Sequence, residues 1–426
     1  MKSAKAKMKT QMSNENHAPA GGAANEQNRS AKLSPNVVKL GWVSLLTDIS
    51  SEMLYPVIPI FLTSVMGAPM AALGLIEGLA ESAANVLKIF SGWWSDRVGK
   101  RRPFVIGGYG LSAFSKPLLA FAQYLGWPFV LAMRVADRTG KGLRTSSRDA
   151  LIADYTPDAL RGRAFGLHRA MDSLGAVLGP LAALYFLARI GQGDQTAQLA
   201  AYRSIFLWAF LPAALGVVLL FLVKEKPFSP RFKRPQFGWG TFNRDFKVFV
   251  LVNLVFALGN SSDAFLIVRA KELFASTGNA MVTVILAYIL YNLTYSLGSY
   301  PAGLLADRFG PRRVFLAGLL LFAAVYVGFA FNRSAALVWP LFAVYGFYTA
   351  FTDGVGKAYA SKLVREDLRA TGMGVYHMSV GLATFVASTA AGLLWQAFGP
   401  AAAFLYGAGM ALLAAGLFVA LVKRRA

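Results

Sequence analysis

The stretch Gly92-Trp-Trp-Ser-Asp96-Arg97-Val-Gly99-Lys-Arg101-Arg102 is repeated in similar form later in this chain of 426 residues. The second copy is Gly303-Leu-Leu-Ala-Asp307-Arg308-Phe-Gly310-Pro-Arg312-Arg313, which begins 211 positions later. At the same shift, Ser50-Ser51-Glu52 corresponds to Ser261-Ser262-Asp263. The repeat predicts a chain of two similar halves, each with an acidic side chain inside an apolar segment.

The composition is that of a membrane protein. Hydrophobic residues make up 56% of the chain and charged residues only 15%, whereas a soluble domain carries about 25% charged residues. The net charge of +22 comes from basic residues scattered between apolar segments, a pattern that indicates membrane topology and not nucleic-acid binding. The chain has no cysteine, which excludes disulfides and thiolate chemistry. It also lacks a Walker loop, a nucleophile elbow and a histidine cluster, so we expect no enzymatic activity, no cofactor and no metal.

Twelve apolar segments are long enough, at about 20 residues each, to cross a bilayer as helices. We place them near residues 38–65, 71–95, 103–125, 127–150, 163–188, 202–223, 247–271, 280–306, 314–331, 335–360, 371–397 and 401–422. The predicted fold is all-α, with twelve transmembrane helices in two six-helix bundles related by pseudo-two-fold symmetry. Residues 37–223 form one bundle and residues 247–426 the other, joined by a basic cytoplasmic linker at 224–246.

The loops predict the orientation in the cell (inner) membrane. Both duplicated loops and the terminal Lys423-Arg424-Arg425 fall on one side, while the opposite loops carry almost no basic residues. By the positive-inside rule, both termini are cytoplasmic. The polar residues 1–36 lack the apolar core of a signal peptide, and we expect them to form a disordered cytoplasmic tail.

The chain resembles the major facilitator superfamily over essentially its whole length after this tail. The Gly-x-x-x-Asp-Arg-x-Gly-x-Arg-Arg loop after the second helix is that family's most specific signature, and both halves carry it. Gly175-Ala-Val-Leu-Gly179-Pro180 resembles the motif of its drug/proton antiporters, although Leu181-Ala182-Ala183 replace the glycines that usually follow.

This resemblance implies a secondary transporter that works by alternating access. It also implies that the duplicated loops latch the halves shut on the cytoplasmic side in the outward-open state. An acid such as Asp96 or Asp307 would there cap a helix N-terminus from the other half. Asp149 and Glu366, at the cytoplasmic ends of spans four and ten, are expected partners for the loop arginines.

Span one carries Asp48, Glu52 and Tyr55 on one helical face. A carboxylate deep in the membrane faces a cavity by default and marks an ion or substrate path; the alternative is a static ion pair. Because burial disfavours the charged form, such a group can exchange protons. Glu52 and its repeat mate Asp263 are therefore the leading candidates for proton coupling, while Gly259 occupies the position that corresponds to Asp48.

Span four carries a basic stripe that includes Arg134, Arg138 and Lys141, with Asp137 placed to neutralise them. A deep guanidinium can hold an anionic substrate group or control the protonation of a nearby carboxylate. In the second half, Asp353 and Lys357 are spaced to pair with each other.

Span two adds Glu77, Glu81 and Lys88. We expect Glu77 near the outer surface and the other two in internal ion pairs.

Two functions remain open. The first is proton-coupled export of small amphipathic organic molecules, with aromatic side chains of spans eight and ten lining the cavity. The second is transport of a specific organic anion held by Arg134, Arg138 and Lys141. Metal-ion efflux through Asp48, Glu52 and Asp263 is a weaker third reading, because histidine and cysteine are so scarce. The expected partners are a small-molecule substrate, protons and the lipid bilayer, and we expect a monomer.

Overall fold

The computed structural model describes residues 33–157, 160–190, 195–225, 239–276, 278–365 and 368–421. In these ranges, eleven helical segments are long and apolar enough to cross a membrane. The remaining predicted span is span four. It corresponds to the helix α8 (Trp127–Asp154), whose 28 residues include the basic stripe and are therefore less apolar than the others. The protein is a multi-pass, all-α membrane protein with the predicted twelve spans.

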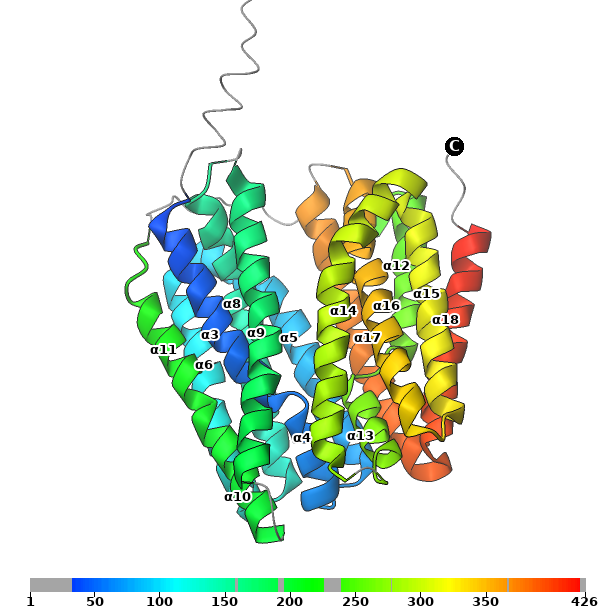
Figure 1. Ribbon diagram of the computed structural model, residues 1–426. Coiled ribbons are helices and arrows are strands. Elements are labelled where there is room, and N and C mark those ends of the chain that lie inside the picture. Colours follow the sequence, from blue (N-terminus) through cyan, green and yellow to red (C-terminus); the bar gives the residue numbers. More distant parts are fainter. Residues whose placement is uncertain are drawn as a thin grey trace, which may run out of the picture.

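The first six spans follow one another from Pro35 to Leu220 and lie together on the left of Figure 1. Their helices are α3 (Pro35–Leu54), α4 (Val57–Ile60), η1 (Phe61–Val65), α5 (Met70–Val98), α6 (Arg102–Leu118), η2 (Leu119–Phe121), α7 (Ala122–Leu125), α8, α9 (Arg161–Ile190), α10 (Gln195–Trp208) and α11 (Phe210–Leu220).

The second six spans form the right-hand bundle in Figure 1. After the short η4 (Trp239–Thr241), they consist of α12 (Arg244–Gly259), α13 (Ala264–Leu273), α14 (Ala280–Phe309), α15 (Pro311–Phe331), α16 (Ala335–Leu363), α17 (Arg369–Phe398) and α18 (Pro400–Leu421). The predicted two-bundle architecture is confirmed.

Spans one and seven are broken, although the sequence predicted continuous helices at 38–65 and 247–271. Span one breaks after Leu54, where Pro56 lacks the N–H that would continue the helical hydrogen bonds. Span seven leaves the helix at residues 260–262, between α12 and α13. Non-helical backbone at membrane depth is tolerated where it lines a cavity or is buried in protein, and broken helices often form substrate sites in transporters. Each break lies within a few residues of a duplicated acid.

The two halves pack closely at the end opposite the duplicated loops. There α5 lies against α17, and a methyl group on Gly392 would come within 2.5 Å of the Met70 carbonyl oxygen. The half-helices α4 and α13 also touch at this end (Figure 1). We call the end that carries the duplicated loops the loop end and the other the closed end.

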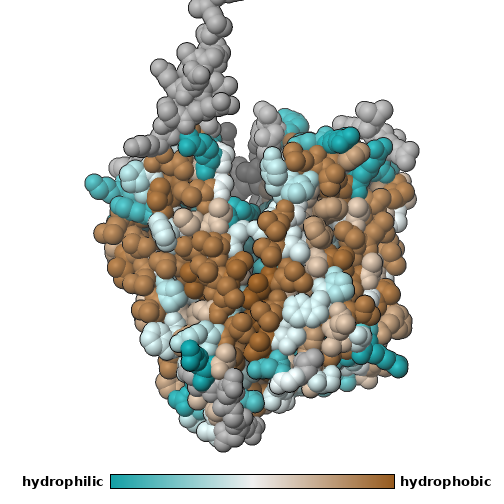
Figure 2. Space-filling model, viewed as in Figure 1, coloured by the Kyte–Doolittle hydropathy of each residue, from teal (hydrophilic) through white to brown (hydrophobic). Residues whose placement is uncertain are grey.

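The surface of the molecule is hydrophobic around its middle and hydrophilic at its two ends (Figure 2). Figure 2 shows a broad belt of hydrophobic residues around both bundles with hydrophilic residues at the two ends, as a bilayer requires. At the loop end, a notch separates the halves, and hydrophilic residues are visible inside it.

Candidate functional site

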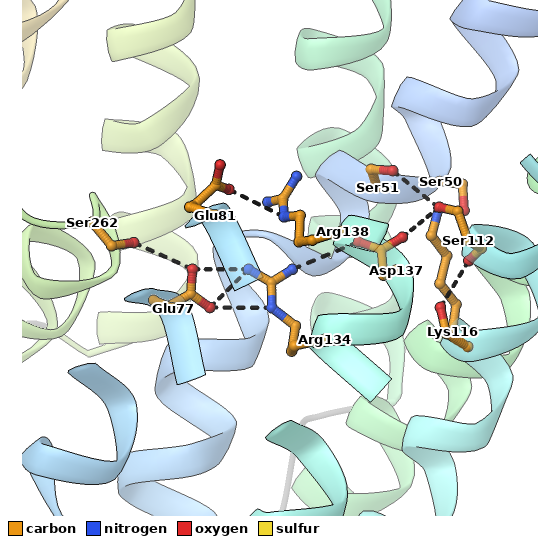
Figure 3. Close-up of polar contacts among 11 residues, drawn as sticks. Ser50, Ser51, Glu77, Glu81, Ser112, Lys116, Arg134, Asp137, Arg138 and Ser262 are labelled. Carbon is orange, nitrogen blue, oxygen red and sulfur yellow. Dashed lines mark hydrogen bonds and ion pairs between the residues drawn. The ribbon is translucent and has the colours of Figure 1, made fainter. Parts of the chain in front are cut away.

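The most deeply buried ion pair joins span two to span four. The Arg134 guanidinium donates to both oxygens of Glu77 at 2.7 and 2.9 Å, and the two side chains are only 5% and 1% exposed. Glu77 also accepts a 3.3 Å hydrogen bond from Ser262 of the second half (Figure 3). The expectation that Glu77 lies near the outer surface is therefore wrong, because its carboxylate is held between the halves.

A second pair repeats this arrangement one turn further along both helices. Arg138 lies 3.1 Å from Glu81 (Figure 3) and also lies over the ring of Tyr55, at 5.7 Å from its centroid. Glu77 and Glu81 are four residues apart on α5, and Arg134 and Arg138 are four apart on α8. This matching spacing on two neighbouring helices is the sequence signal that identifies both pairs.

Asp137 lies on the side of Arg134 that is opposite Glu77 (Figure 3), and the sequence predicted that it neutralises the basic stripe. Its carboxylate is 4.0 Å from Arg134 and accepts a hydrogen bond from Ser112 of α6. Asp137 thus helps to balance the charge of the basic stripe, as predicted.

Lys116 of α6 is a buried charge that the sequence analysis missed. The side chain is 2% exposed, and its ammonium donates to the hydroxyls of Ser50 and Ser51 at 2.7 and 3.0 Å (Figure 3). These serines immediately precede Glu52, so Lys116 fixes the segment of span one that carries this acid. The available signal was a lone lysine in the middle of an apolar span, where a charge is normally functional.

Two classes can be distinguished among seven acids of the core: Asp48, Glu52, Glu77, Glu81, Asp137, Asp263 and Asp353. Four have a basic partner within 4.0 Å: Glu77, Glu81, Asp137 and Asp353. The Asp353 carboxylate lies 2.5 Å from the Lys357 ammonium, so the predicted pairing of these two residues is confirmed.

The other three acids of the core are Asp48, Glu52 and Asp263, and within the described ranges they have no such basic partner. Glu52 accepts a hydrogen bond from Tyr288 at 2.9 Å, and Asp263 accepts one from Tyr345 at 2.7 Å. Within the same ranges, the carboxylate of Asp48 makes no hydrogen bond or ion pair. These three are among the five acids that the sequence predicts to bind substrate or exchange protons; the other two are Asp137 and Asp353.

Lys141 is the base of the stripe that remains without a close acid. In the part of the chain that the structure describes, its ammonium has neither a hydrogen bond nor an ion pair within 4.0 Å. It nevertheless acts electrostatically on Asp48, Glu52 and Glu81. Lys141 therefore influences the two span-one acids but neutralises neither of them by direct contact.

The glycines of the Gly175–Pro180 motif lie directly against the span-one acids. A methyl group on Gly175 would lie 2.7 Å from Cβ of Asp48, and one on Gly179 would lie 2.7 Å from Cβ of Glu52. Only glycine allows α9 and α3 to approach so closely. The motif, which the sequence assigned to gating, thus positions Asp48 and Glu52.

Replacing Gly179 with alanine is expected to destabilise the protein by about 1–3 kcal/mol, the usual cost of overpacking. The added methyl would also come within 2.6 Å of the Ile49 carbonyl oxygen, so α3 and α9 must separate. The matched control is Gly166→Ala on the same helix, where a methyl group meets nothing within 4 Å. Thermal unfolding of both purified variants checks this; equal melting temperatures would show that the contact does not constrain the helices.

Among the described residues, the first duplicated loop contacts its own half and Glu225, which follows span six at the start of the linker. Arg101 pairs with Asp96 at 3.2 Å and with Asp154 at the end of α8, and Arg102 donates to the Phe221 carbonyl oxygen at 2.8 Å. Gly99 ends α5 in a left-handed conformation (φ 70°). Asp96 is exposed and caps no helix of the other half in this conformation.

Two further gating residues of this loop region can be placed. Gly92 packs beside Ser146 of α8, and the Arg97 guanidinium lies 5.4 Å from the centre of the Trp93 ring. Asp149 does not pair with a loop arginine as predicted, but with its neighbour Arg148 at 2.9 Å. The residue at loop level is Asp154, because α8 continues beyond the predicted end of span four at 150.

The second duplicated loop is likewise bonded within its own half. Arg312 donates to the Val419 carbonyl oxygen at 3.2 Å, and Gly310 turns the chain into α15 at φ 87°. The Arg313 amide bonds back to Gly310, and Arg308 lies against the Phe309 ring. Asp307 is exposed, and a methyl group on Gly303 would meet nothing within 4 Å. Glu366 lies outside the described residues.

Comparisons with known proteins agree with this architecture. The family model of the Major Facilitator Superfamily matches residues 40–276 and 249–426. An uncharacterized MFS-type transporter of Methanocaldococcus jannaschii is 38% identical over 393 residues, which cover 91% of this chain and 95% of that protein. A multidrug resistance protein of Aeromonas hydrophila is 31% identical over 144 residues, 34% of this chain and 36% of that protein.

Among solved structures, the crystal structure of a D-xylose-proton symporter superposes with a TM-score of 0.71 at 17% identity. The superposition covers 91% of this chain and 97% of the symporter, and at this identity it shows a common fold. The family match over both halves and the similarity to the M. jannaschii transporter identify the chain as a member of the major facilitator superfamily and a secondary transporter.

Proposed function

We propose that this transporter exports small amphipathic organic molecules in exchange for protons. The observation that carries the proposal is a difference among the buried acids: Asp48, Glu52 and Asp263 lack the close basic partner that Glu77, Glu81, Asp137 and Asp353 have. Leaving an ionised carboxylate unpaired and away from water is costly. Acids that take up and release a proton during the transport cycle avoid that cost in the protonated state.

Glu52 is best placed to connect protonation with movement. Its carboxylate accepts the hydroxyl of Tyr288, which belongs to the other half, and the Tyr55 and Tyr288 rings stack at 5.5 Å across the same interface. A rocking motion of the two bundles changes these contacts and so changes how well the ionised form of Glu52 is stabilised. Protonation and the position of the bundles are then linked.

The orientation of the loops supports a state open to the cytoplasm. If the basic loop end faces the cytoplasm, the notch in Figure 2 opens inward. The loop residues then bond within their own halves because the cytoplasmic latch is open. In the outward-open state, Asp96 and Asp307 would reach helix N-termini of the opposite half. One copy of the chain contains both bundles, so a monomer suffices for this cycle.

Three features support export of amphipathic molecules. Gly175–Pro180 resembles a motif of drug/proton antiporters, part of the chain is similar to a multidrug resistance protein, and tyrosine hydroxyls bond Glu52 and Asp263. The test is ethidium efflux from energised bacteria with and without the gene. The proposal predicts faster efflux and greater ethidium resistance in the producing strain, and loss of both when a protonophore is added. Efflux that the protonophore leaves unchanged would contradict proton coupling.

Transport of an organic anion is a second candidate, favoured only by the unpaired ammonium of Lys141. Arg134 and Arg138 already hold Glu77 and Glu81, so an anion would have to compete with these carboxylates. Counterflow of labelled organic anions in proteoliposomes would reveal such an activity. For metal-ion efflux, the described residues contain no group of three or more His, Asp or Glu side chains that could hold a metal ion.

A further inference from the structure

Asp263 lies at the break of span seven, at the first turn of a half-helix. It precedes α13, yet its side chain does not cap that helix. The backbone amide of Ala264 is instead bonded by the Ser262 hydroxyl at 3.3 Å. The carboxylate therefore does not cap its own helix. The positive end of the α13 dipole nevertheless favours its ionised form.

Tyrosine rings surround this carboxylate. Tyr345 donates its hydroxyl to Asp263 at 2.7 Å, and the Tyr291 hydroxyl lies close to the same group. The Tyr291 ring centroid is 5.2 Å from that of Tyr345 and 5.6 Å from that of Tyr288. Stacking of Tyr288 on Tyr55 continues the row to the first half. Tyrosine faces attract cations, and such aromatic sites recognise quaternary ammonium groups.

The charges around Asp263 differ from those around its repeat mate. The charged side chains that act most strongly on Asp263 are themselves acids, Glu81 and Glu52. Those that act on Glu52 are the bases Lys141, Arg138 and Arg134. Two equivalent positions of the repeat therefore have different surroundings: three basic side chains act on Glu52, whereas Asp263 has tyrosine hydroxyls beside it and no basic side chain among its strongest charged neighbours.

We propose that Asp263, with the faces of Tyr291 and Tyr345, binds the positively charged group of an amphipathic organic cation. This assignment rests on the proposed function and names its substrate class. The cation replaces the Tyr345 hydroxyl as the partner of the carboxylate, and its apolar part lies along the row of tyrosines towards Glu52. The duplicated acids then have separate tasks, with substrate recognition at Asp263 and proton exchange at Glu52.

The test uses two probes of nearly the same shape and opposite charge. Binding of tetraphenylphosphonium and of tetraphenylborate to the full-length protein in lipid nanodiscs is measured at equilibrium, against empty nanodiscs. We expect saturable binding of tetraphenylphosphonium that is at least tenfold tighter than that of tetraphenylborate. Absence of saturable tetraphenylphosphonium binding, or equal binding of both ions, would overturn the assignment.

Variants locate the site. Asp263→Asn should weaken tetraphenylphosphonium binding at least tenfold, whereas Asp263→Glu keeps the charge and most of the affinity. Tyr345→Phe keeps the aromatic face and removes only the competing hydroxyl, so its affinity should equal or exceed that of wild type. If Asp263→Asn does not fold, Asp263→Glu and Tyr345→Phe still test the assignment. A tenfold loss of tetraphenylphosphonium affinity in both variants would contradict it.

These measurements need no ion gradient, so they are independent of the proton-coupling proposal. Asp263-dependent binding together with protonophore-insensitive efflux would reject proton coupling and keep the cation site. Proton-driven transport without Asp263-dependent cation binding would reject the cation site and keep proton coupling.

Discussion

Replacing Glu77 with alanine is expected to lower the free energy of unfolding by about 3–5 kcal/mol, because it strands a buried charge. The Arg134 guanidinium bonds both oxygens of this carboxylate, and its side chain is only 5% exposed. Ser262 of the second half would lose its contact with Glu77 as well. Chemical or thermal unfolding of the purified protein measures the loss.

Two comparisons separate this effect from a general sensitivity to lost charge. Glu272→Ala removes a helical ion pair with Arg269 whose acid is 44% exposed, and should cost no more than about 1 kcal/mol. The double variant Glu77→Leu with Arg134→Leu removes both charges and should recover most of the stability, because buried pairs are often replaceable by apolar residues. A loss below about 1 kcal/mol for Glu77→Ala would show that Arg134 does not depend on this partner.

Replacing Glu52 with glutamine is expected to abolish proton-driven transport while leaving substrate exchange intact. Glutamine has nearly the same shape and can still accept the Tyr288 hydroxyl bond, but it cannot exchange a proton. In proteoliposomes, ethidium accumulation driven by a pH gradient should fall to the level seen without a gradient. Counterflow of ethidium, which requires binding and the rocking motion but no net proton movement, should continue.

Glu52→Asp and Glu272→Gln serve as controls for this variant. The first keeps a titratable group at the site and should retain part of the gradient-driven rate, and the second alters an exposed acid and should behave as wild type. Gradient-driven accumulation by Glu52→Gln at the wild-type rate would remove Glu52 from the coupling mechanism. Loss of counterflow in the same variant would show instead that Glu52 is needed for substrate binding or for movement.

The large-scale architecture was predictable because its signals are repeated and chemically unambiguous. The copies around Asp96 and Asp307 and the alternation of apolar segments with basic loops are enough to predict two bundles of six helices. The acids of span one could also be singled out, because a carboxylate in an apolar segment has few purely structural reasons to be there.

What the sequence did not reveal depends on which side chains meet across helices. Glu77 was placed near the outer surface because it stands close to the start of its span, and nothing in one helix alone shows that Arg134 faces it. The role of Lys116 was not predicted because its close partners are two uncharged serines of span one, so no pattern of opposite charges points to them. The break before Asp263 contains no proline, unlike the break at Pro56. Its signal is the run Gly259-Asn260-Ser261-Ser262, whose residue types favour helix ends and loops.

The structure also shows why the repeat is only partly symmetric. The serines before Glu52 are bonded by Lys116 in the same half, whereas Ser262, before Asp263, bonds Glu77 across the interface. The serines of the first copy are thus held within their own bundle, whereas a serine of the second copy helps to join the two bundles. Equivalent positions in the sequence have acquired different partners and, in our proposal, different tasks.

The most direct test of proton coupling is proton movement driven by substrate alone. Wild-type protein is reconstituted into vesicles that contain a pH-sensitive dye, with no initial pH difference, and ethidium is added outside. We predict that ethidium entry drives protons out and raises the internal pH, and that Glu52→Gln vesicles show no such change. Ethidium entry through the wild-type protein with a constant internal pH would contradict the account.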